Sequence, residues 1–83
     1  MACKRYVEMI VRYMTDGTIL PLAVRWIPGQ IYEVDRVLDI RPAASLKAGG
    51  AGIRYTCRIQ GKEKYLWLEG SRWFVEAKSE ELS

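Results

Sequence analysis

Apolar and polar side chains alternate along most of this chain, and short turn sequences interrupt the alternation repeatedly. Alternation with a period of two is typical of β-strands that bury one face, and closely spaced turns join such strands into antiparallel hairpins. A chain of 83 residues has room for one small domain. We therefore expect a single all-β domain at residues 1–78, followed by a frayed polar tail at residues 79–83.

The first hairpin is set by Asp16-Gly17, because a type I′ turn needs positive φ at both central residues. A two-residue loop at this point places Tyr13 opposite Leu20 and Met9 opposite Val24, all on the face that points into the core. For the next connection we expect three residues, Pro28-Gly29-Gln30, since a loop of two residues would bury the carboxylate of Glu33.

Two later turns begin with glycine, as a type II′ turn requires. Gly61-Lys62 joins two strands whose outer face carries Arg54, Arg58 and Tyr65. Gly70-Ser71 then places Trp67 opposite Phe74 on the same outer face. These hairpins predict that arginines and aromatic rings lie side by side on one surface.

Five or six short antiparallel strands in successive hairpins are best closed as a small, SH3-like, partly open barrel, which protects the sheet edges. Beyond Val34 the alternation changes phase, which predicts a bulge or a bend onto a second sheet. Residues 41–48 allow one short helical turn, with Pro42 in its first turn, inside a long glycine-rich connection.

Catalysis and metal binding find little support in the composition. The chain has no histidine, which is the commonest general base and metal ligand. Cys3 and Cys57 lie far apart and do not form a metal-ligand spacing. Asp35 and Asp39 have arginines beside them and are expected to be ion-paired surface acids. We therefore expect no enzyme, no cofactor and no metal.

Positive charge is concentrated in residues 41–64, which hold six basic side chains and one acidic side chain, whereas the remainder of the chain is slightly acidic. Aromatic rings interleaved with guanidinium groups can stack bases and neutralise phosphates. The candidate binding residues are Arg41, Lys47, Arg54, Arg58, Tyr65, Trp67 and Phe74. An alternative stays open, in which Trp67 and Phe74 belong to a second side of the core. Their exposure in the folded monomer decides between the two interpretations.

The expected function is that of a non-enzymatic binding module for single-stranded nucleic acid or for a nucleic-acid-processing protein. The alternative is a protein-interaction or self-association module, for example a homodimer. Glu8 and Arg12 interrupt the N-terminal apolar run, and no stretch reaches the length of a membrane span. A cytoplasmic protein without a membrane partner is therefore expected.

Two segments carry a resemblance to a known family. Trp26 with residues 32–39, and Tyr65-Leu66 with Gly70 and residues 72–75, resemble a family of small uncharacterised bacterial domains. Some members of that family are encoded near Y-family lesion-bypass DNA polymerases. The resemblance covers about half of the chain, and residues 47–52 depart from it as an insertion. It implies an accessory role around DNA repair or mobile DNA, where the partner would be single-stranded nucleic acid or a DNA-repair protein, and it offers no catalytic residues to carry over.

Overall fold

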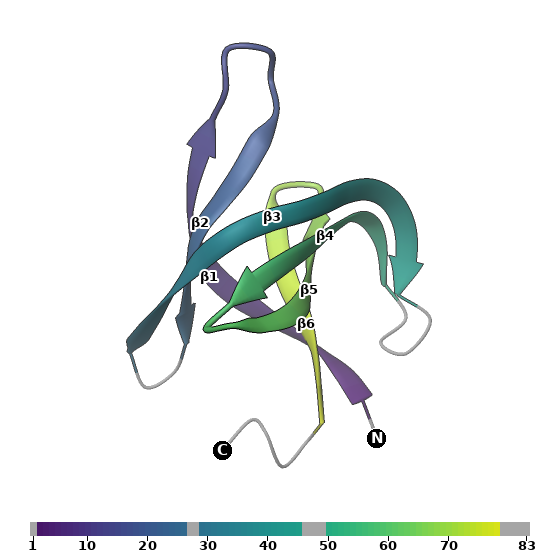
Figure 1. Cartoon of the computed structure of the whole chain (residues 1–83). Coiled ribbons are helices and arrows are strands. Elements are labelled where there is room, and N and C mark those ends of the chain that lie inside the picture. Colours follow the sequence, from purple (N-terminus) through teal and green to yellow (C-terminus); the bar gives the residue numbers. More distant parts are fainter. Residues whose placement is uncertain (1, 27–28, 46–49, 79–83) are drawn as a thin grey trace.

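Six antiparallel strands follow one another around a barrel, and β6 pairs with β1 to close it (Figure 1). The computed structural model describes residues 2–26, 29–45 and 50–78, with side chains at 4–26, 29–44 and 52–76. The strands are β1 (Ala2–Tyr13), β2 (Ile19–Trp26), β3 (Gln30–Ser45), β4 (Gly50–Ile59), β5 (Lys62–Glu69) and β6 (Arg72–Lys78). The predicted small all-β barrel is confirmed, and it is closed rather than partly open. Within the described ranges, no helix is long and apolar enough to cross a membrane.

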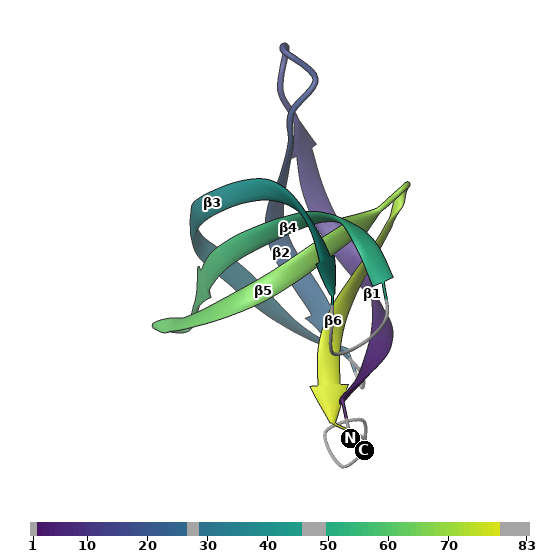
Figure 2. The ribbon, with the colours of Figure 1, turned by 90° about the vertical axis from the view of Figure 1, so that its right-hand side faces the viewer.

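Two long strands, β1 and β3, each contribute to two parts of the barrel wall (Figure 2). The first half of β1 pairs with β6 and its second half pairs with β2. Strand β3 pairs first with β2 and then, from Val34 onwards, with β4. Two register shifts, between Val34 and Arg36 and between Val37 and Asp39, bend β3. The bulge or bend predicted beyond Val34 is therefore confirmed.

The first hairpin differs from the prediction at its tip and agrees with it further along. The amide of Gly17 donates to the carbonyl of Met14, and Gly17 has a φ of 91°, so the tip is one residue longer than Asp16-Gly17 alone. A register shift after Ile10 offsets the extra residue, and Met9 lies opposite Val24 as predicted. The expectation that this face is buried as far as Tyr13 is wrong, because that ring is 74% exposed.

Two other hairpins have the predicted faces in a different register. Trp26 pairs with Gln30, so the pairing of β2 with β3 is displaced by two residues from the prediction. The turn between β4 and β5 is Gln60-Gly61 rather than Gly61-Lys62, and both of its residues have positive φ. A displacement by two residues leaves every side chain on its predicted face, since the side-chain period of a strand is two.

The helical turn expected within residues 41–48 is wrong for its described part. Residues 41–45 continue β3 and pair with the first residues of β4, whereas residues 46–48 lie outside the described ranges. Strand pairing satisfies the backbone of this segment, and an isolated helix of this length is unstable. Gly52 allows a close contact here, because a Cβ atom on it would lie 2.2 Å from the carbonyl oxygen of Leu68.

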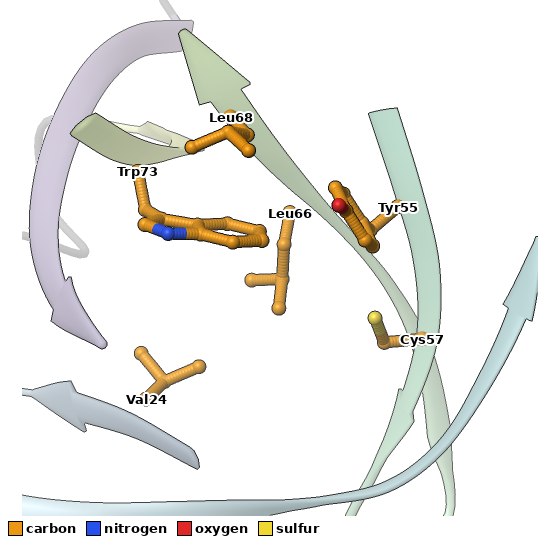
Figure 3. Close-up of a cluster of buried hydrophobic side chains, with 6 residues drawn as sticks. All are labelled: Val24, Tyr55, Cys57, Leu66, Leu68 and Trp73. Carbon is orange, nitrogen blue, oxygen red and sulfur yellow. The ribbon is translucent and has the colours of Figure 1, made fainter. Parts of the chain in front are cut away.

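The core fills the barrel interior with side chains from four strands (Figure 3). Its buried members are Val24, Tyr55, Cys57, Leu66, Leu68 and Trp73. The hydroxyl of Tyr55 donates to the carbonyl of Ile19 at 2.6 Å, which satisfies the polar end of that ring and joins β4 to β2. Burial also raises the pKa of the Cys57 thiol to about 11.

Candidate functional site

The outer face of β4, β5 and β6 brings most of the predicted site residues together. Arg54 lies directly opposite Trp67, and Trp67 lies directly opposite Phe74. One row along, Tyr65 is the cross-strand neighbour of Thr56. The sequence therefore predicted correctly which side chains share this face, although it paired β4 with β5 two residues out of register.

The fourth strand of the face is β3, which adds two arginines. Arg41 lies opposite Arg54, and Arg36 lies opposite Arg58. Arg41 was predicted to belong to the site, whereas Arg36 was not. Lys47, the remaining predicted residue, lies outside the described residues.

Trp67 and Phe74 are buried although they point away from the barrel interior. Their exposed fractions are 2% and 0%. The two rings stack in parallel with centroids 5.8 Å apart. The ring of Tyr6 meets Phe74 edge to face at 5.9 Å, and Lys4 Nζ lies 4.9 Å from the Phe74 centroid. The prediction that these two rings offer a stacking surface is wrong for the folded monomer.

The side chains around Phe74 form a network in which Lys4 has its counter-ion within the fold. Lys4 Nζ lies 3.1 Å from a carboxylate oxygen of Glu69, and the Tyr6 hydroxyl donates to the same carboxylate at 2.7 Å. The guanidinium of Arg72 lies 3.5 Å from the centroid of the Tyr6 ring. The hydrogen bond to Glu69 raises the pKa of Lys4 above its ordinary value. We call this region the packed half of the outer face: Lys4, Tyr6, Trp67, Glu69, Arg72 and Phe74.

The other part of the face carries exposed cations around one aromatic ring. Tyr65 is 44% exposed, and the guanidinium carbon of Arg54 lies 4.7 Å from its ring centroid. Trp67 supports the ring from beneath, edge to face at 6.4 Å. We call this region the basic half: Arg36, Arg41, Arg54, Arg58 and Tyr65.

The basic half holds like charges directly opposite one another, which is unfavourable in a sheet. Asp39 relieves one pair, because it accepts a hydrogen bond from Arg41 at 2.6 Å. This bond lowers the pKa of Asp39 and confirms the expected surface ion pair. Asp35 instead accepts a hydrogen bond from the Gly61 amide.

The second pair, Arg36 and Arg58, keeps its mutual repulsion. Both side chains are exposed, and neither forms an ion pair with a carboxylate within the described part of the chain. Glu63 lies across from Arg58 in the ladder without making such a pair. Two guanidinium groups are therefore available to an external anion.

Arg54 and Trp67, which face each other across β4 and β5, have a further common feature. Arg54 Nε and Trp67 Nε1 are buried and have no hydrogen-bond acceptor among the residues that the structure describes. A buried donor without an acceptor is destabilising. The Nε–H group of Arg54 therefore does not anchor the guanidinium on Tyr65 through a hydrogen bond within the described residues.

A cavity of about 540 Å³ opens at the end of the barrel next to the basic half. Its aromatic wall consists of Trp26, Tyr32 and Tyr65, so Tyr65 belongs to both places. We call this cavity the barrel mouth. Across the described side chains, no group of three histidine, cysteine, aspartate or glutamate residues could hold a metal ion.

Comparison with known proteins gives no relative from which a role could be transferred: no family model, curated protein or solved structure matches the chain.

Proposed function

We propose that this protein is a non-enzymatic binding module that contacts single-stranded nucleic acid through the basic half. The observation that carries the proposal is the unpaired Arg36–Arg58 couple beside the exposed ring of Tyr65. Glu63 lies opposite Arg58 in the ladder but forms no ion pair with it, so neither guanidinium has a counter-ion among the described residues. A phosphate group would relieve their repulsion and receive charge-assisted hydrogen bonds.

The two arginine pairs lie on either side of Tyr65, in the rows before and after it. Arg54 and Arg58 are four residues apart on one strand, which separates them by about 13 Å. A base stacked on Tyr65 would therefore have cations on both sides for the flanking phosphates. On this face only the ring of Tyr65 is open to a base, since Trp67 and Phe74 are buried, so we expect the face to bind with weak sequence preference and an affinity dominated by charge.

The resemblance to bacterial domains encoded near lesion-bypass polymerases supports a cytoplasmic role around DNA repair. A single strand exposed during repair is the substrate that the basic half would fit. A DNA-repair protein with an acidic surface would meet the same cations, and the salt dependence and base dependence of binding separate the two partners.

The proposal is tested by the fluorescence anisotropy of a labelled thymidine strand of about twelve nucleotides, titrated at several salt concentrations. Affinity should fall steeply with salt, and Arg54→Ala with Arg58→Ala should weaken it about tenfold or more and reduce the salt slope by about two. The control variant, Arg12→Ala with Arg25→Ala, removes the same charge from exposed positions of the first hairpin. Equal affinities for the two double variants would refute the proposed face.

A separate observation favours a second candidate function, which is self-association or binding of another protein. Ile10 on β1 and Ile31 on β3 are 48% and 55% exposed, and they share the outer face of the sheet with Ala23 and Arg25 of the intervening strand β2. Exposed aliphatic side chains on one face of a sheet favour an interaction surface. Sedimentation at several protein concentrations tests it: a dimer insensitive to salt, abolished by Ile31→Lys and without oligonucleotide binding, would favour this function over the first.

A further inference from the structure

The barrel mouth is built like a small ligand site. Its volume of about 540 Å³ falls within the range of such sites, which occur often in the mouths of β-barrels. Val24, Leu66 and Val75 line it with apolar atoms, and Trp26 and Tyr32 add flat aromatic walls. The combination suits a ligand with a planar ring.

The walls of the mouth are held in place before any ligand arrives. The guanidinium of Arg5 lies 5.1 Å from the ring centroid of Trp26. The hydroxyl of Tyr32 donates to the side-chain oxygen of Gln30. Fixed aromatic walls lose little side-chain entropy when a ligand binds between them.

Buried apolar side chains form part of the lining of the mouth. Val24 is 4% exposed and Leu66 is 2% exposed, and both line the cavity. A flat ring that entered the mouth would therefore contact apolar side chains.

The rim places cations between the mouth and the basic half. Lys62 and Lys64 line the cavity and are exposed. Arg58 lies opposite Glu63, which stands between the two lysines in sequence, and Tyr65 is shared by both places. A chain of cations therefore leads from Arg36 and Arg58 to the edge of the cavity.

We propose that the barrel mouth receives one base of the single strand whose backbone lies on the basic half, with its phosphate at Lys62 and Lys64. This inference rests on the proposed function, since it needs a strand on that face. The base would be sandwiched by the walls at Trp26 and Tyr32 and would rest on Leu66 and Val75.

The test uses methyl NMR spectra of the full chain, titrated with a thymidine strand of about eight nucleotides. A strand of the same length made only of abasic units serves as the matched ligand. The expected result is that the thymidine strand shifts the methyl signals of Leu66 and Val75, whereas the abasic strand binds without shifting them. The methyl signals of Val11 and Ile19, which do not line the mouth, should stay in place with both strands.

Binding affinities of a variant test the mouth site independently. Tyr32→Leu should weaken binding of the thymidine strand about tenfold and leave binding of the abasic strand unchanged. Tyr13→Leu, at an exposed ring on the first hairpin, is the matched control and should change neither.

The possible outcomes distinguish the mouth site from the proposed function on which it rests. Binding of the thymidine strand that shifts signals on the basic half and leaves Leu66 and Val75 unmoved would overturn the mouth site alone. Failure of both strands to bind would overturn the proposed function and the mouth site together.

Discussion

The two halves of the outer face use the same residue types in opposite ways. In the packed half, Lys4 lies over the ring of Phe74 and pairs with Glu69, and the stacked rings are sealed from solvent. In the basic half, Arg36 and Arg58 oppose each other and the ring of Tyr65 is open. Cations beside aromatic rings are part of the packing in the packed half and form a candidate interface in the basic half.

The difference lies in whether the cations beside the ring are paired with a carboxylate. Glu69 accepts hydrogen bonds from both Lys4 and Tyr6, so the cation near Phe74 has its counter-ion within the fold. The Arg36–Arg58 pair has none in the described part of the chain. Residue composition alone does not distinguish the two halves, whereas the pairing of charges does.

The largest expected effect is on the free energy of unfolding, which should depend far more on the buried ring of Phe74 than on the partly exposed ring of Tyr65. Phe74→Ala should lower the free energy of unfolding by about 3–5 kcal/mol, because it leaves a cavity in the packed half. Tyr65→Ala should lower it by about 0.5–1 kcal/mol, since it removes one partly exposed ring and its contact with Arg54. Urea denaturation measures both values, and Phe74→Leu keeps the comparison available if the alanine variant does not fold. Equal losses at the two positions would break the distinction between the halves.

The next effect tests whether Cys57, a core residue beneath the basic half, is shielded from water in the native state. Burial raises the pKa of Cys57 to about 11, above the unfolded value of 9.0. Between these values the unfolded state loses a proton that the native state keeps, so stability should fall as pH rises from 9 to 11, by about 3 kcal/mol at most. Unfolding of the wild type and of Cys57→Ala at several alkaline pH values isolates this contribution. Parallel curves for the two proteins would show that the thiol is not buried.

A smaller effect concerns Gly52 on β4, which lies close to the backbone of Leu68 on β5. Gly52→Ala should lower the free energy of unfolding by about 1–3 kcal/mol, because its Cβ would meet the backbone of Leu68. Gly52→Asn should be at least as harmful. Gly61 has positive φ and open space around it, so Gly61→Asn should stay within about 0.5 kcal/mol of the wild type. Thermal or urea unfolding of the variants checks the order.

The smallest effect has the opposite sign. Arg36→Glu replaces a like-charged pair by an opposite-charged pair, so it should raise the free energy of unfolding by about 0.2–1 kcal/mol while weakening oligonucleotide binding. The same change at Arg25 places two carboxylates opposite each other, because Glu8 is its partner, and should lower stability. Urea denaturation and anisotropy titration measure the two quantities. Destabilisation by Arg36→Glu would contradict the repulsion that we infer.

Local turn chemistry was enough to predict much of the fold. The turn that begins at Gly70, where φ is 62°, gives the register that places Trp67 opposite Phe74. In the first hairpin, a longer turn and a register shift cancel, so that Met9 meets Val24 as expected. At Gln60-Gly61 the sequence misled us, because a glutamine adopts the positive φ that we assigned to glycine alone.

The candidate site was only half predictable, because alternation assigns a face and does not reveal what covers it. Phe74 is covered from β1, by Lys4 and Tyr6, and Lys4 is 65 residues away from its partner Glu69. Such a contact depends on closure of the barrel, which no local pattern specifies. Arg36 was missed for a related reason, since two register shifts in β3 hide the face on which it lies.

The central claim is that the basic half binds a single strand and the packed half does not. Nitrogen-15 NMR spectra, recorded while a short thymidine strand is added, test it most directly. The account predicts shifts at the amides and Nε–H groups of Arg36, Arg54 and Arg58, with the signals of Tyr6 and Phe74 unmoved. Shifts centred on Ile10 and Ile31, or no shifts at all, would contradict it.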